Sequence, residues 1–191
     1  CFVQTLDGLT GKTTYHRYPL DQFATKPDRF AVRVGPSFFS AHEIALNLDS
    51  PEQQMVGVLR FTGSKPWPVT WRSPGIMDWY AFVPFMETYH GVVSLDHAVA
   101  GSLVVDGSNA DFSGGRGYTE KDWGQAFPSA WVWMQTNHFD QPGVSLTASV
   151  ARIPWLFSAF RGFIVGFLCD GHLYRFATYT GATIERLEVT H

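Results

Sequence analysis

The 191-residue chain has few charged side chains and no run of basic ones. Charged residues make up 16% of the sequence, and the formal net charge is −3. Binding to nucleic acid needs a stripe of Lys and Arg that neutralises phosphates, so the sequence argues against that function. Disorder is also excluded, because hydrophobic residues account for 45% of the chain and supply ample apolar surface to bury.

Cysteines and long apolar runs are equally scarce. Two cysteines, Cys1 and Cys169, cannot build a disulfide framework, which favours a reducing compartment and a cytoplasmic location. The longest apolar stretches, such as Phe163–Cys169, are too short to cross a bilayer as a helix. A peripheral contact with a membrane stays open.

Helical periodicity is missing, and hairpin signals take its place. No segment carries a sustained 3.6-residue apolar stripe, and we expect at most single helical turns at Asp21–Thr25 and Asp49–Glu52. Turn pairs separate segments rich in Val, Phe, Tyr and Thr, as in β-hairpins. These pairs are Asp7-Gly8, Asp106-Gly107, Asp170-Gly171 and Thr180-Gly181. The pattern predicts an all-β, antiparallel barrel or sandwich.

The strands are expected at short, regular intervals. Their predicted ranges are 2–6, 13–16, 29–34, 42–48, 55–62, 91–95, 100–105, 130–139, 144–152, 163–169, 172–179 and 183–189. The chain starts at Cys1 inside one such strand and stops after Ile184–Val189, which also reads as a strand. We therefore expect a fragment trimmed at both ends, because unpaired edge strands are avoided in intact proteins.

Aromatic residues are abundant: sixteen Phe, seven Tyr and seven Trp make up 16% of the chain. Such a content can line a wide apolar cavity as well as fill a core. Many of these residues lie between Tyr118 and Phe139, a stretch that reads YTEKDWGQAFPSAWVWMQTNHF. If residues 130–139 are extended, alternate side chains share a face. That face holds Trp131, Trp133, Gln135, Asn137 and Phe139, either as the lining of a ligand pocket or as ordinary barrel core.

This stretch resembles the tocopherol cyclase family. The family carries Tyr-x-Glu-Lys-Asn-Trp-Gly-x-x-Phe-Pro followed by Trp-x-Trp-x-Gln-x-Asn-x-Phe, and the match here covers 22 residues, with weaker likeness at Pro84–Glu87 and Gly91–Val93. One position departs from the pattern, because the plant-type enzymes carry Asn where this chain has Asp122. Identity of substrate and of acid chemistry is therefore not implied at that position.

The resemblance implies a fold, a domain division and a reaction. The fold would be two lipocalin-like (calycin-type) barrel halves, with residues 1–117 in the N-terminal half and residues 118–191 beginning the C-terminal half. The reaction would close a chromanol ring on a prenylated hydroquinone by acid-catalysed protonation of its alkene, without a metal or organic cofactor. Substrate contacts would come from the motif positions Tyr118, Trp123, Phe127, Trp131, Trp133, Gln135 and Asn137. A non-catalytic isoprenoid or lipid carrier and a carotenoid hydratase-type enzyme are the alternatives.

Glu120 and Asp122 are the candidate acids. Two residues apart on a strand, they would share a face, and each would affect the proton affinity of the other, while Lys121 would point away beside Trp123. A salt-bridge network on the surface or between the barrel halves is the competing interpretation.

His90 is the candidate acid–base histidine, with Asp96 and His97 nearby in sequence. A histidine fixed in a turn or on a strand surface is the alternative. The seven histidines show no metal-ligand spacing, Phe112–Gly117 lacks the ending of a phosphate loop, and Asp106–Asp111 reads as a hairpin turn rather than a calcium loop.

Overall fold

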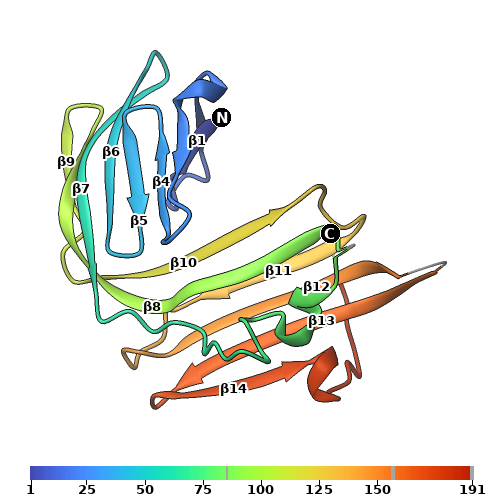
Figure 1. Cartoon of the computed structure of the whole chain (residues 1–191). Helices are drawn as coiled ribbons and strands as arrows, with labels where there is room; N and C mark the ends of the chain where they lie inside the picture. The colour runs from blue at the N-terminus through green and yellow to red at the C-terminus, as the bar shows by residue number, and fades with distance from the viewer. Residues whose placement is uncertain (85, 156–157, 190–191) are drawn as a thin grey trace. The chain divides into compact units, whose positions relative to one another are not determined.

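The computed structural model describes residues 1–84, 86–155 and 158–189 (Figure 1). Strands and three short 3₁₀ helices make up its regular structure, and every strand pairing with an assigned register is antiparallel. The all-β, antiparallel prediction is therefore confirmed, while its lipocalin-like part stays a prediction. Phe85, within one of the stretches of weaker family likeness, lies outside the described residues.

The chain divides into two compact units. The first contains residues 1–63 and 98–117, and the second contains residues 64–97 and 118–191. Two strands, β8 (Thr88–Val105) and β10 (Gly115–Gly124), contribute residues to both units. The predicted division into barrel halves at residue 117 stays a prediction.

The first unit holds a hairpin and most of a curled sheet. The hairpin pairs β1 (Phe2–Leu6) with β2 (Thr13–Arg17), and η1 (Leu20–Gln22) follows it. The sheet runs in the order β10-β8-β7-β6-β5-β4-β3, with β9 paired to β8, and its strands in this unit curl into a half-barrel (Figure 1). Its remaining strands are β3 (Phe23–Thr25), β4 (Ala31–Val34), β5 (Ser37–Ser40), β6 (Glu43–Ser50), β7 (Gln53–Thr62) and β9 (Ser108–Asp111).

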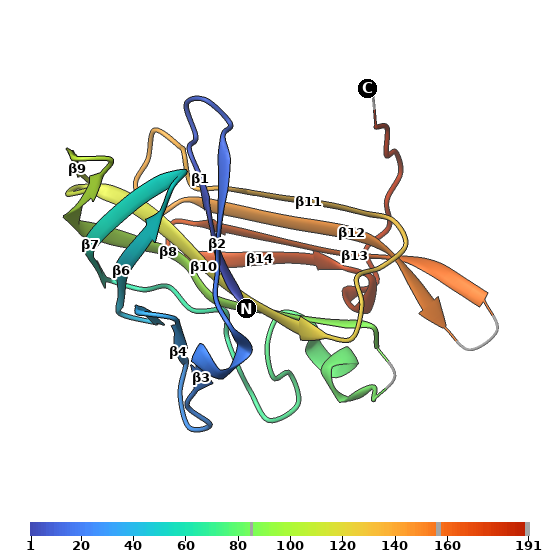
Figure 2. The same ribbon diagram turned by 90° about the horizontal axis from the view of Figure 1, so that it is seen from above.

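The second unit is built on a four-stranded sheet in the order β11-β12-β13-β14. In Figure 2 these strands run side by side. They are β11 (Trp131–Thr136), β12 (Ser145–Trp155), β13 (Ser158–Cys169) and β14 (His172–Ala177). Two short 3₁₀ helices, η2 (Asp78–Phe82) and η3 (Thr178–Thr180), belong to the same unit.

Asp-Gly pairs close two of the hairpins, as the sequence predicts. Asp106 and Gly107 have φ of 49° and 81°, and Asp170 and Gly171 have φ of 51° and 74°. Two consecutive residues with positive φ are what a type I′ turn requires, and this turn matches the twist of the strands it joins. Asp and Gly tolerate that conformation better than other residues, which explains why the local sequence predicts these turns.

Several local predictions are wrong. Asp49–Glu52 starts no helix, because Ser50 and Gln53 end the β6–β7 pairing and the two residues between them form a tight turn. In the Asp21–Thr25 region a single turn occurs at Leu20–Gln22, and Phe23–Thr25 is strand. Residues 183–189 contain no strand. The strands predicted separately at 91–95 and 100–105 are one strand, β8, and β10, which begins at Gly115, is missing from the predicted strands.

Each unit has its own buried core. In the first unit one cluster contains Leu59, Phe61, Val99 and Leu103, and another contains Val3, Val34 and Leu48. The cluster of the second unit consists of Trp67, Ile76, Met77, Met86, Val92, Leu95 and Leu168. Trp67 comes from the proline-rich segment after β7, so a stretch without regular structure supplies the largest side chain in that core.

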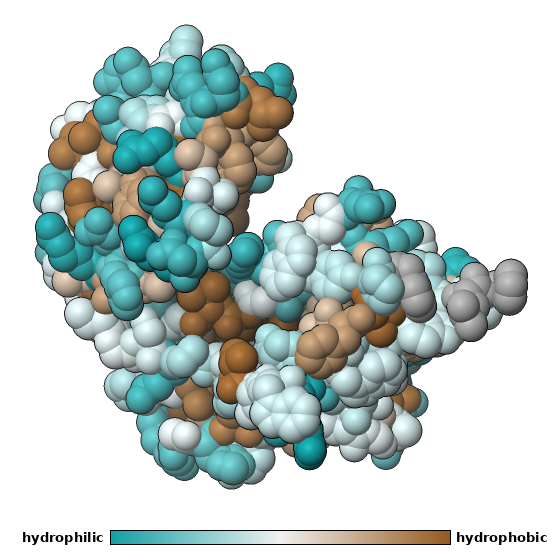
Figure 3. Space-filling view, viewed as in Figure 1, coloured by the Kyte–Doolittle hydropathy of each residue, from teal (hydrophilic) through white to brown (hydrophobic). Residues whose placement is uncertain are grey.

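The surface carries many large apolar side chains. Trp71, Phe127 and Leu9 are among the exposed ones, and Figure 3 shows brown and teal side chains intermingled over the visible face. Within residues 1–84, 86–155 and 158–189, no helix is long and apolar enough to cross a membrane.

The packing of Trp67 depends on a glycine of β13. A Cβ added to Gly166 would lie 2.4 Å from Cζ3 of Trp67, whose side chain is 1% exposed. We expect Gly166→Ala to displace the ring and lower the free energy of unfolding by about 1–3 kcal/mol, because overpacking a filled core costs that much. Urea denaturation measures the change. Gly8→Ala is the matched control, since no atom lies within 4 Å of its added Cβ; equal losses in both variants would contradict the prediction.

Candidate active site

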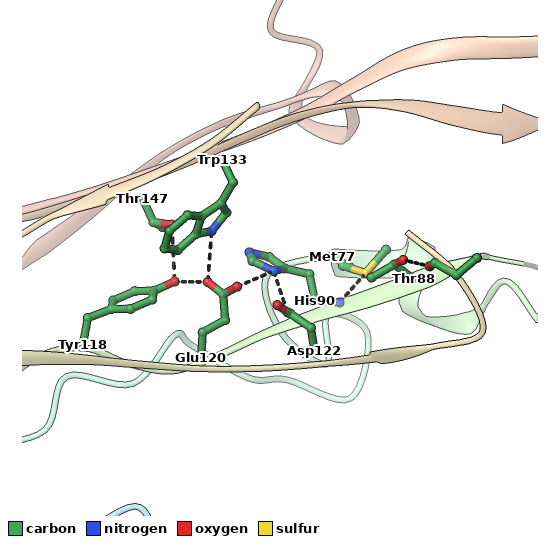
Figure 4. A network of polar contacts seen from close by, with 9 residues as sticks. Met77, Thr88, His90, Tyr118, Glu120, Asp122, Trp133 and Thr147 are labelled. Carbon is green, nitrogen blue, oxygen red and sulfur yellow. Dashed lines mark hydrogen bonds and ion pairs between the residues drawn. The ribbon is translucent and has the colours of Figure 1, made fainter. Parts of the chain in front are cut away.

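The second unit brings together three ionisable side chains from β8 and β10. Nδ1 of His90 lies 2.8 Å from Oδ1 of Asp122 and 3.1 Å from Oε1 of Glu120 (Figure 4). Glu120 and Asp122 share one face of β10 because side chains two apart on a strand point the same way. Neighbouring strands in the sheet, β8 and β10, then place His90 between the two carboxylates.

A chain of hydrogen bonds continues from Glu120 away from His90. The hydroxyl of Tyr118 and Nε1 of Trp133 both donate to Oε2 of Glu120, the second over 3.3 Å. Oγ1 of Thr147 lies 3.3 Å from the Tyr118 hydroxyl (Figure 4). Each carboxylate oxygen of Glu120 therefore has a defined partner: Oε1 faces the imidazole, and Oε2 accepts from the phenol and the indole.

This environment stabilises the charged form of His90. Burial would lower its pKa, but the hydrogen bonds and charges of Asp122 and Glu120 outweigh burial and raise the pKa from 6.5 to about 9. Burial likewise opposes the charged form of Asp122, yet the bond to His90 holds the pKa of that carboxyl below its usual value. Burial and the bond to Glu120 raise the pKa of Tyr118, so its hydroxyl stays a donor. At neutral pH the site thus contains an imidazolium between two carboxylates.

The second nitrogen of His90 has a different setting. Nε2 is buried, and it has no hydrogen-bond partner among the described residues. In Figure 4 the contacts to both carboxylates leave from the other ring nitrogen, Nδ1. An imidazolium in this position carries one N–H that is already engaged and one that is free to donate.

His90 also lines an apolar cavity of about 370 Å³. Such a volume lies within the range of small-molecule sites. The lining residues come from strands β8 and β10 to β13, from η2 and η3, and from the loops next to them: Met77, Tyr80, Met86, Thr88, His90, Glu120, Asp122, Phe127, Pro128, Trp131, Trp133, Ser149, Ala151, Ile153, Phe160, Gly162, Phe163, Ile164, Thr178 and Tyr179. The polar cluster is therefore one patch on an otherwise largely apolar wall.

The predicted substrate-contact residues divide into three groups. Phe127, Trp131 and Trp133 line the 370 Å³ cavity, with the Phe127 and Trp131 rings stacked 5.5 Å apart. Trp123 lines a smaller cavity of about 250 Å³ next to Asp122. The residues Tyr118, Gln135 and Asn137 are absent from the described lining of either cavity. Their substrate contacts stay predictions.

The predicted common face of residues 131–139 holds only in part. The strand β11 ends at Thr136, so Trp131, Trp133 and Gln135 share its face, whereas Asn137 and Phe139 lie beyond it. Nδ2 of Asn137 lies 3.4 Å from Oδ1 of Asp96, a fully buried residue. His97, the other histidine considered, is also buried, and Nδ1 of its ring lies 3.1 Å from Oγ of Ser94. Burial lowers the pKa of His97.

The opposite face of the β8–β10 pair carries a stacked pair of aromatic rings. The rings of Tyr89 and Trp123 stack with centroids 5.7 Å apart, and Nζ of Lys121 lies 5.2 Å from the Trp123 centroid. A Cβ on Gly91 would approach Trp123 to 3.1 Å. Lys121 thus points away from Glu120 and Asp122, as the alternation predicts, and both acids form ion pairs with His90.

Sequence reasoning missed several cavity residues. Tyr80 and Tyr179 come from 3₁₀ helices, and Phe160 comes from a strand predicted to start only at residue 163. The Tyr179 hydroxyl donates to the Ile76 carbonyl over 2.8 Å, and burial followed by the charge of Asp78 raises its pKa to about 12. Thr88 was detectable, since it precedes His90 by two positions on the same strand face.

The ligand atoms of His90, Glu120 and Asp122 lie within 4.8 Å of one another, close enough in principle to hold a metal ion. The hydrogen bonds argue for a different role. Nδ1 faces both carboxylates at donor–acceptor distances, which is the geometry of a shared proton rather than of ligands arranged around a cation. We therefore treat the cluster as an acid–base site.

The raised pKa makes stability depend on pH in a defined direction. A histidine whose pKa rises on folding from 6.5 to about 9 stabilises the fold fully below pH 6.5, and the contribution disappears as the pH rises through about 9. We expect the loss to be at most about 3–4 kcal/mol. Urea denaturation across this range measures it, and His90→Gln should flatten the curve there. An identical pH dependence in the variant would contradict the assignment.

Comparisons with known proteins indicate the family of the chain. A family model described as tocopherol cyclase-like matches residues 49–187, which include β8, β10 and the whole cavity lining. A probable chloroplastic tocopherol cyclase of Oryza sativa subsp. japonica is 29% identical over 117 residues, covering 59% of this chain and 25% of the relative. The chloroplastic tocopherol cyclase of Zea mays is 29% identical over 109 residues, covering 54% and 23%.

The matched region thus spans about a quarter of the length of each of these curated relatives. No solved structure matches it significantly. The family match covers well over half of the chain, including every residue of the His90 cluster. On that basis the chain belongs to the tocopherol cyclase-like family.

Proposed function

We propose that the protein closes a chromanol-type ring on a prenylated hydroquinone by general acid catalysis, with His90 as the proton donor. The observation that carries the proposal is that the two ring nitrogens of His90 have different surroundings. Nδ1 is held by two carboxylates, whereas Nε2 is buried without a partner among the described residues, on a side chain that lines an apolar cavity. The family membership supports this class of reaction.

The proposed reaction neither gains nor loses atoms. The Nε2–H of the imidazolium gives its proton to the less substituted carbon of the prenyl double bond, which leaves a tertiary carbocation on the other carbon. The neighbouring phenol oxygen forms a C–O bond to that cation. The phenol proton then passes to Nε2, so the histidine returns to its starting state. Glu120 and Asp122 keep Nδ1 protonated throughout and do not need to exchange a proton.

The cavity also suits the charge that develops on the substrate. With His90 protonated, the three-residue cluster has a net charge of about −1. When the proton moves to the substrate the charge of the cluster becomes about −2, which favours the nearby carbocation. The π faces of Trp131, Trp133 and Phe160 offer further stabilisation of a carbocation.

The decisive assay incubates the protein with a prenylated hydroquinone and looks for a cyclised isomer of unchanged mass. We expect His90→Gln to lower kcat by about 100-fold or more, which is the usual contribution of a general acid. His138→Gln, a change at an exposed histidine in the same motif, is the matched control and should keep full activity. Binding without isomerisation would favour a lipid carrier, and a product heavier by one water would favour a hydratase.

The pH profile separates His90 from the two carboxyl groups as the donor. With His90 as the acid, kcat stays level up to neutral pH and falls as the pH rises through about 9. Glu120→Gln and Asp122→Asn each remove one carboxylate partner, so both should move this fall to lower pH while leaving substrate binding intact. If either amide variant instead loses all turnover at a pH where His90 is still protonated, that carboxyl group is the donor.

A further inference from the structure

Tyr118 matches a family motif position, yet it is not among the described lining residues of either cavity. Its hydroxyl donates to Oε2 of Glu120, the carboxylate whose other oxygen faces His90. We propose that Tyr118 is a positioning residue, which acts through Glu120 and limits how much of the Glu120 negative charge His90 receives. The inference rests on the proposed function for its catalytic consequence, but its electrostatic part does not.

The geometry makes Tyr118 and His90 competitors for one carboxylate. The phenol and the Trp133 indole donate to Oε2, and the imidazole pairs with Oε1 over 3.1 Å. A hydrogen bond to a carboxylate stabilises its negative charge and weakens its attraction for other cations. Removing the phenol O–H therefore leaves more of the Glu120 charge to His90, which becomes a weaker acid.

Thr147, on β12, extends this hydrogen-bond chain beyond Tyr118. Its Oγ1 lies 3.3 Å from the Tyr118 hydroxyl, and its side chain is 1% exposed. Because the single phenol proton points to Glu120, the Thr147 hydroxyl is left to donate to the phenol oxygen. A phenol that accepts such a bond is a stronger donor in turn. The order of donation is thus Thr147 to Tyr118, and Tyr118 to Glu120.

No other described group of the cavity wall would imitate this effect near the pKa of His90. The lining residues from β11, β12 and β13 are not ionisable. Tyr80 of η2 and Tyr179 of η3 do line the cavity, but burial raises the pKa of both phenols, that of Tyr179 to about 12. The ionisable groups that remain on the wall beside His90 are Glu120 and Asp122 of β10.

The test titrates His90 by NMR in the full chain, with its imidazole signals assigned by their loss in His90→Gln. Tyr118→Phe should move the His90 titration to higher pH by up to roughly one unit. Thr147→Val should move it in the same direction by less, and it serves as the second variant if Tyr118→Phe fails to fold. The matched control is Tyr89→Phe. The Tyr89 side chain lies on the other face of the strand and its hydroxyl donates to the Val83 carbonyl, so its removal should leave the titration unchanged.

The kinetic arm adds the catalytic consequence. A weaker acid should lower kcat of Tyr118→Phe by up to about tenfold and move the basic fall of the pH profile upward, with KM unchanged because Tyr118 is absent from the cavity wall. An unchanged or lowered His90 titration, or an effect confined to KM, would overturn the inference. If the protein has no cyclase activity but the His90 titration still moves in Tyr118→Phe, the proposed function is wrong and the electrostatic role of Tyr118 is kept.

Discussion

One proton between a histidine and two carboxylates organises the candidate site. His90 is held by Asp122 and Glu120 on a neighbouring strand, and the hydrogen bonds of Tyr118 and Trp133 extend from the same Glu120 side chain. Burial by itself would leave the imidazole neutral, so the carboxylates decide its charge. The same contact joins β8 to β10 through side chains, in addition to the ladder between them.

Part of this arrangement could be predicted from local sequence. The two-residue period places Glu120 and Asp122 on one face and Lys121 on the other, and the Asp-Gly turns fix two hairpins. These features depend on backbone geometry over a few residues. They needed no knowledge of which strands become neighbours, and that is why they could be inferred.

The rest depends on contacts between distant segments. Nothing local in the sequence shows that residues 88–90 lie beside residues 120–122, or that the two short apolar runs around Ala98 form one strand of 18 residues. The helical turn expected at Asp49–Glu52 was wrong because Ser50 and Pro51, residue types that suit the start of a helix, also fit a tight turn once β6 and β7 pair. The contact of Asn137 with a buried aspartate on β8 is likewise something that periodicity cannot reveal.

The stacked Tyr89 and Trp123 rings, on the strand face opposite the site, have a consequence for the energy of the proton transfer. Tyr89 precedes His90 in the chain, and its ring is stacked on Trp123, the residue that follows Asp122. A Cβ on Gly91 would make a tight contact, 3.1 Å, with the Trp123 ring. The stacked rings therefore hold the backbone beside His90 against the backbone beside Asp122. Dipoles held in this way have little freedom to relax when charge moves, so the reorganisation energy of the site should be small compared with that of the same groups in water.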